Sequence, residues 1–85
     1  MARKITDVIS EIMKKGKFEK SSLSEKQLRI HLNNLFYLYR KEPNQMMARL
    51  VYSAIIDLAR LGKGALANEY AMRFEEEIGY DNLEE

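Results

Sequence analysis

Apolar residues recur at spacings of three and four along four segments of this chain, and this periodicity restricts it to a helical fold. Residues that end helices separate the segments and close the last one: Gly16, Pro43, Gly62 and Gly79. We expect helices over residues 6–15, 24–41, 44–61 and 65–78. The sequence therefore predicts a single all-α domain over residues 1–85, a compact four-helix bundle-like fold with a loose acidic tail at residues 81–85.

The second and third predicted helices carry the clearest signals. Ser24 and Gln27 fit a capping box at the start of the second helix. The inner stripe of that helix is predicted to be Leu28, Leu32, Leu35, Phe36 and Tyr39. The third helix is apolar over most of its circumference, so we expect it to be central. Its main stripe is Met47, Leu50, Val51, Ala54, Ile55 and Leu58. The short Gly62–Gly64 connection predicts an antiparallel hairpin of the third and fourth helices.

Composition excludes several classes of protein. The chain has no cysteine, so it forms no disulfide, thiol nucleophile or zinc-thiolate site. Its charged N-terminus lacks the apolar core of a signal peptide. The longest apolar run is far shorter than the roughly 20 residues that span a bilayer. We therefore expect a cytoplasmic protein that makes no membrane contact.

No residue pattern predicts catalysis. The chain has neither a glycine-rich phosphate loop nor a nucleophile elbow. His31 is the only histidine, and the sequence places no further metal ligand beside it. Glu75, Glu76 and Glu77 spread over more than half a helical turn and do not converge on one ion. We interpret them as a solvated acidic face, with a contact for a basic partner as the alternative. We expect no enzyme, no catalytic residue, no metal site and no cofactor.

Charge is distributed unevenly along the chain. Residues 1–43 contain ten Lys or Arg against five Asp or Glu, and residues 44–85 contain four against eight. Such asymmetry marks either a nucleic-acid contact at one end or two halves that neutralise each other. The candidate phosphate-binding residues are Lys14, Lys15, Lys17, Lys20, Lys26 and Arg29. A solvated loop is the alternative interpretation of the lysines that follow the first helix.

A second candidate surface combines the outer side of the second helix with a second apolar stripe of the third. Aromatic and arginine side chains on an exposed face favour a protein interface or the stacking of nucleic-acid bases. The candidate partner-binding residues are Ile30, Asn33, Tyr37, Arg40, Tyr52 and Ile56. We expect a partner protein or a second copy of the chain to cover part of this surface.

The chain as a whole resembles a known group of small proteins. Its size, its lack of cysteine, its helical pattern and its lysine-rich opening, Ile9-Ser10-Glu11-Ile12-Met13-Lys14-Lys15-Gly16, carry the resemblance. It is similar to the small helical accessory subunits of the crenarchaeal B-family DNA polymerase holoenzyme. The resemblance implies an archaeal, non-catalytic subunit that binds the polymerase and supports its stability or synthesis near DNA. It rests on no motif, so it assigns no functional residue.

These observations lead to one functional hypothesis and two alternatives. The first is a protein-binding accessory subunit, with a DNA polymerase as the partner that the resemblance implies. The second is a small nucleic-acid-binding protein that uses the basic N-terminal patch. The third is a homo-oligomeric structural protein. The sequence leaves the identity of the partner and the stoichiometry open.

Overall fold

The computed structural model describes residues 3–18 and 24–83 of the chain, without the side chains of residues 81 and 82. Its helices are α1 (Ile5–Lys15), α2 (Glu25–Lys41), α3 (Gln45–Arg60) and α4 (Gly64–Glu77), followed by a short 3-10 helix, η1 (Tyr80–Leu83). The predicted all-α four-helix fold is confirmed, and every predicted helix boundary lies within one residue of the observed one.

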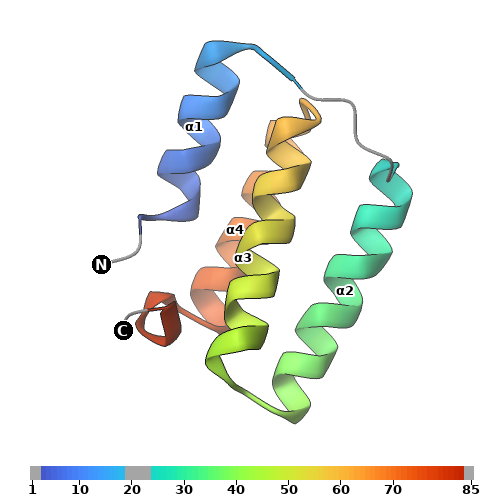
Figure 1. The fold of residues 1–85 in the computed structure, drawn as a ribbon, viewed down its shortest axis with the longest axis vertical. Helices are drawn as coiled ribbons and strands as arrows, with labels where there is room; N and C mark the ends of the chain where they lie inside the picture. Colours follow the sequence, from blue (N-terminus) through green and yellow to red (C-terminus); the bar gives the residue numbers. More distant parts are fainter. Residues whose placement is uncertain (1–2, 19–23, 84–85) are drawn as a thin grey trace.

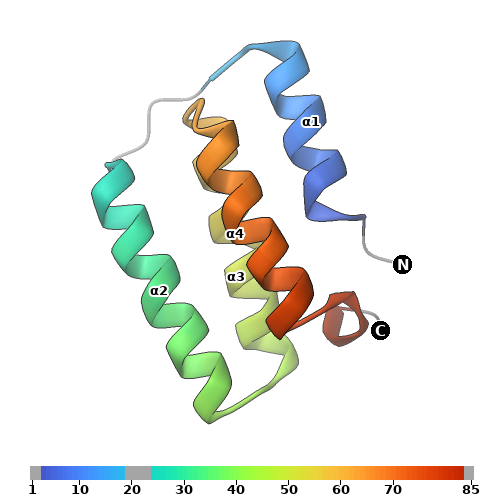
Figure 2. The same cartoon turned by 180° about the vertical axis from the view of Figure 1, so that it is seen from behind.

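α3 occupies the centre of the fold. It packs against α1, α2, α4 and η1, which confirms its predicted central position. α1 and α2 lie on either side of the α3–α4 pair (Figure 1), and the view from behind shows α4 covering the back of α3 (Figure 2). α4 runs antiparallel to α3, as the short connection predicts. The end of α1, the start of α2 and the α3–α4 turn therefore meet at one end of the molecule, opposite the α2–α3 turn.

Local sequence signals set the ends of α2 and the start of α3. The Ser24 Oγ accepts a hydrogen bond from the Gln27 N–H at 3.2 Å, and the Gln27 Oε1 accepts one from the Ser24 N–H at 2.9 Å. The predicted capping box is thus confirmed. α2 ends before Pro43, which disfavours helical backbone in the residue that precedes it. Asn44 then caps α3, since its Oδ1 accepts from the Met47 N–H at 2.9 Å.

A Schellman turn at Gly62 reverses the chain between α3 and α4. The Gly62 N–H donates to the Ala59 carbonyl at 2.9 Å, and the Lys63 N–H donates to the Leu58 carbonyl at 3.1 Å. This geometry needs the positive φ of Gly62, which is +85°. The ring of Phe18 packs over Gly62, because a Cβ built there would lie 3.4 Å from a ring carbon. The segment after α1 is thereby fixed to the α3–α4 turn.

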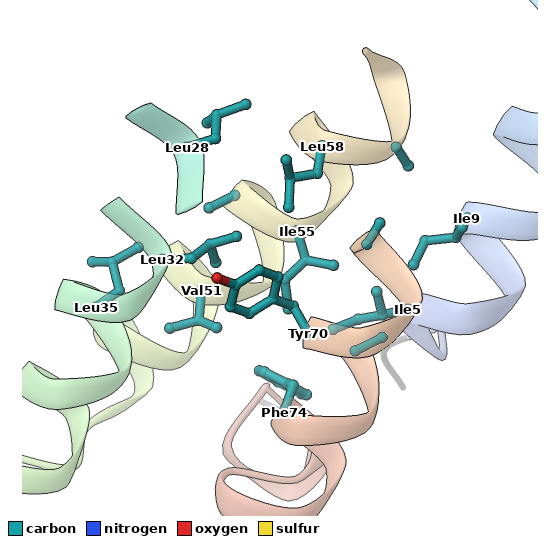
Figure 3. Packing of buried hydrophobic residues seen from close by; sticks show 14 of the residues in the cluster. Ile5, Ile9, Leu28, Leu32, Leu35, Val51, Ile55, Leu58, Tyr70 and Phe74 are labelled. Carbon is teal, nitrogen blue, oxygen red and sulfur yellow. The ribbon is translucent and has the colours of Figure 1, made fainter. Parts of the chain in front are cut away.

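The core lies where α1, α2 and α4 face α3. Figure 3 shows side chains from α1, α2 and α4 converging on Val51, Ile55 and Leu58 of α3, and all three of these are fully buried. The predicted inner stripe of α2 is confirmed, because all five of its residues are buried. The predicted main stripe of α3 is wrong at one position, because Leu50 is 46% exposed.

The chain after α4 differs from the loose tail that the sequence predicts. Residues 80–83 form η1, and Tyr80 and Leu83 pack against the core. The Tyr80 hydroxyl accepts from the Ile5 N–H at 3.0 Å and donates to the Glu75 carboxylate at 2.9 Å. Burial of the ring, reinforced by Glu75, raises the pKa of Tyr80 to about 12. Residues 81–83 of the predicted tail are thus part of η1, while Glu84 and Glu85 lie outside the described residues.

Two isoleucines test this view of the core. Ile55 is fully buried. We expect Ile55→Ala to lower the free energy of unfolding by about 2–5 kcal/mol, because it removes packed methyl groups and leaves a cavity. The matched Ile30→Ala variant alters a side chain that is 52% exposed and should change stability by no more than about 0.5 kcal/mol. Urea denaturation measures both variants, and equal losses would contradict the packing described above.

Candidate protein-binding surface

Exposed apolar side chains gather on the hairpin formed by α2 and α3. Eight large apolar residues are exposed in the part of the chain that the structure describes, and five of them lie on this hairpin. We call these five the hairpin face: Ile30, Tyr37, Leu38, Met46 and Leu50. Met46 is 71% exposed, the most of any of the eight. Single exposed apolar residues are ordinary on protein surfaces, so the placement of these five relative to each other decides their meaning.

Contacts to α4 show which way Leu38 and Leu50 point. The Arg40 Nε on α2 donates to the Glu77 Oε1 on α4 at 2.7 Å. Leu38 lies about 200° around the helix from Arg40, and so projects away from α4. The Tyr52 ring on α3 meets the Phe74 ring of α4 edge-on, with centroids 6.2 Å apart. By the same geometry Leu50, two residues before Tyr52, also projects away from α4.

The remaining members extend this surface along both helices. α2 and α3 pack together and are joined by a short turn, and Leu38 and Leu50 both project away from α4 within three helical turns of it. Met46 lies one helical turn before Leu50. Ile30 and Tyr37 are two turns apart on the outer edge of α2, and Tyr37 is next to Leu38. The Nζ of Lys41 lies 4.8 Å from the centre of the Tyr37 ring, which places a cation at the border of the face.

Two of the predicted partner-binding residues instead join α2 to α4. The Asn33 Oδ1 accepts from the Tyr70 hydroxyl at 3.2 Å and from an Arg73 guanidinium nitrogen at 3.3 Å. Arg40 and Arg73 both donate to the carboxylate of Glu77, each at 2.7 Å. Asn33 and Arg40 are exposed, but their polar groups are already engaged in the fold.

Tyr52 and Ile56 lie on a different side of α3 from the hairpin face. Both side chains are half-buried. The Tyr52 hydroxyl donates to the Arg3 carbonyl at 2.8 Å, just before α1 begins. α1 packs on this flank of α3, so the second apolar stripe is largely covered inside the fold. The structure therefore places Ile30 and Tyr37 on the same side of α2, and Tyr52 and Ile56 on a separate surface.

The predicted nucleic-acid-binding residues are exposed wherever the structure describes them. Lys14 and Lys15 end α1, and Lys17 follows it. Lys26 and Arg29 occupy the first turns of α2, at the same end of the molecule. Lys20 lies outside the described residues.

The acidic cluster of α4 has internal partners. Burial alone would raise the pKa of Glu77, but hydrogen bonds from Arg73 and Arg40 outweigh it and hold that pKa below its ordinary value. Glu75 accepts from the Tyr80 hydroxyl. His31 is exposed. Within residues 3–18 and 24–83, no group of three His, Cys, Asp or Glu side chains is placed to hold a metal ion. No helix of that part is long and apolar enough to cross a membrane.

No protein-family model, curated protein or solved structure matches this chain.

Sequence reasoning missed three members of the hairpin face: Leu38, Met46 and Leu50. On a helical wheel of α3, Met46 and Leu50 fall at the edge of the apolar stripe. The position of α2 decides whether that edge is covered, and periodicity does not supply that position. Leu38 lies outside the inner stripe of α2, which is the one signal in the sequence that marks it as exposed.

The Glu77 contacts predict a pH-dependent contribution to stability. Because the pKa of Glu77 is lowered by folding, its stabilising effect is present at neutral pH and is lost as pH falls through the folded-state pKa. We expect Glu77→Gln to lower the free energy of unfolding by about 1 kcal/mol at neutral pH, since the two ion pairs are partly exposed to solvent. The difference from the parent chain should shrink as pH falls below the ordinary value of 4.5.

Chemical denaturation of the parent chain and the variant between neutral and acidic pH measures this effect. The matched control is Glu76→Gln, which removes a neighbouring exposed carboxylate and should leave stability nearly unchanged at each pH. A loss in Glu77→Gln that stays constant down to about pH 3 would show that the ion pairs do not cause it.

Proposed function

We propose that this protein is a non-catalytic accessory subunit that binds another protein through the hairpin face. A DNA polymerase is the first partner to test, and the cytoplasm is the proposed place of action. The observation that carries the proposal is the gathering of five exposed large apolar side chains on one hairpin. A contiguous apolar patch on an otherwise charged surface is typical of an interaction site.

The residue types of the hairpin face suit a protein interface. Tyrosine and methionine are enriched at interfaces, and the face contains Tyr37 and Met46. Methionine has three rotatable bonds, so Met46 adapts to the shape of a partner. The Tyr37 ring is held by Lys41, which reduces the entropy lost when the ring is covered.

Charges on α2 indicate the chemistry of the partner. From Lys26 to Lys41 the helix contains no acidic residue, and the cation of Lys41 borders the hairpin face. A partner that offers apolar side chains flanked by carboxylates would complement this helix. A second copy of the chain, placed against it by a two-fold axis, would bring the same cations together. The charge pattern therefore favours a different, acidic-rimmed protein over self-association.

A pair of substitutions tests the hairpin face. Leu38→Gln combined with Leu50→Gln replaces two exposed apolar side chains by polar ones of similar helix propensity. We expect the double variant to bind the DNA polymerase of the source organism about 30-fold more weakly than the parent chain, equivalent to about 2 kcal/mol. Isothermal titration calorimetry with the purified polymerase measures the affinity.

Met72→Gln provides the matched control. Met72 is 61% exposed on α4, outside the hairpin face, so its loss should leave the affinity unchanged. Equal weakening by both variants, or none by the double variant, would remove the hairpin face from the proposal. If the parent chain does not bind the polymerase, the polymerase is not its partner. A molar mass that rises with concentration in sedimentation equilibrium, and falls in the double variant, would instead identify a homo-oligomer.

A further inference from the structure

Three separate segments bring basic side chains to one end of the molecule. α1 ends there with Lys14 and Lys15, and Lys17 follows. α2 starts there with Lys26 and Arg29, and the α3–α4 turn adds Lys63 (Figures 1 and 2). We call Lys14, Lys15, Lys17, Lys26 and Arg29 the basic end. Its members come from α2 and from the end of α1 with the residue that follows it, so only the fold assembles this surface.

The cations of the basic end differ from most of the others in the molecule. Arg3, Arg40, Arg60, Lys63 and Arg73 each form an ion pair with a carboxylate. No member of the basic end makes an ion pair with another described residue, and all five are exposed. The paired cations have their charge neutralised within the fold, whereas the basic end presents its charge to solvent.

Three nearby carboxylates pair with other cations, although Glu11 also attracts Lys15 and Glu69 lines a pocket with Arg29. Glu25 pairs with Lys63 at 3.8 Å, and Asp57 pairs with Arg60 at 3.8 Å. Glu11 is turned toward Arg3, with 2.8 Å between the paired atoms. Residues 19–23, which the structure does not describe, contain Glu19 and Lys20 and carry no net charge.

We propose that the basic end binds the phosphate backbone of duplex nucleic acid without reading its sequence. Lysines act as flexible point charges and suit an array of phosphates. The shorter extents of the molecule are 27 and 18 Å. Along 27 Å a duplex carries about 16 phosphates, more than enough to engage five cations.

Two apolar side chains at this end, Met13 and Phe18, pack partly against the fold. Membrane-binding faces combine basic residues with apolar side chains that enter the lipid. Phe18 lies over Gly62, and Met13 lies against Gly64, where an added Cβ would sit 2.8 Å from its Cγ. Phe18 is nevertheless 46% exposed and Met13 37% exposed, so the test below includes phosphatidylserine vesicles beside the duplex.

This inference goes beyond the proposed function and does not depend on it. The basic end lies at the opposite end of the molecule from the α2–α3 turn, near which Leu38, Met46 and Leu50 lie. A partner protein at Leu38, Met46 and Leu50 would leave Lys14, Lys15 and Lys17 accessible, whereas Ile30 of the hairpin face adjoins Arg29 of the basic end. One chain would then hold a protein at one end and a duplex at the other.

Fluorescence anisotropy of a short labelled DNA duplex, titrated with the full chain over a range of salt concentrations, tests the proposal. Five phosphate contacts predict a slope of roughly −4.5 for the logarithm of the association constant against the logarithm of salt concentration. Lys14→Gln combined with Lys17→Gln should make the slope shallower by about 1.8 and weaken binding at least about tenfold at about 0.1 M salt.

The matched control removes the same charge elsewhere. Lys4 precedes the start of α1 and Lys41 ends α2, so both lie away from the basic end, and Lys4→Gln combined with Lys41→Gln should nearly keep the parent slope and affinity. Equal loss in both double variants would show attraction by net charge alone and overturn the assignment. So would a parent chain that fails to bind the duplex at low salt, or that binds phosphatidylserine vesicles and not DNA. Circular dichroism melting checks that each variant is folded. The double variant Leu38→Gln with Leu50→Gln should bind the DNA duplex as tightly as the parent chain does.

Discussion

The packing of α3 against its neighbours is the constraint on which the rest of the structure depends. α3 is apolar over most of its circumference, and such a helix is stable in water only when other helices cover it. α1, α2 and α4 each cover one side, and the side chains they contribute are fully buried where they meet Val51, Ile55 and Leu58. The strip of α3 that remains exposed is narrow, and Met46 and Leu50 lie at its edge.

Polar side chains then fix the orientation of α2 relative to α4. Arg73 is central to this arrangement, because it donates hydrogen bonds to Glu77 and Asn33. Its guanidinium carbon also lies 4.3 Å from the centre of the Phe36 ring. The Phe36 and Tyr70 rings stack beside it with centroids 6.2 Å apart. By turning one flank of α2 toward α4, these contacts leave the opposite flank, with Leu38, facing solvent. The interactions that stabilise the bundle thus also determine which apolar residues a partner could reach.

The two candidate surfaces differ in chemistry as well as in position. The hairpin face is apolar with a basic border, so the affinity of a partner there would depend on buried area and shape. The basic end is charged, so its affinity for phosphates would depend on salt. If both proposals hold, the chain is a small adaptor that holds a protein near a duplex. The protein-binding and the nucleic-acid-binding hypotheses drawn from the sequence would then both apply.

The sequence by itself determined the number of helices, their ends and the inner stripe of α2. Those features depend on local signals: periodicity, the Ser24–Gln27 capping box and the helix-ending residues. The tertiary structure alone decided that Leu50 is exposed, that α1 covers Tyr52, and that Tyr80 is tied to Ile5 across the whole length of the chain. It also decided that lysines of two helices share one end. The physical reason is that a helical wheel fixes directions around one axis, whereas exposure and surface charge depend on where the other axes lie.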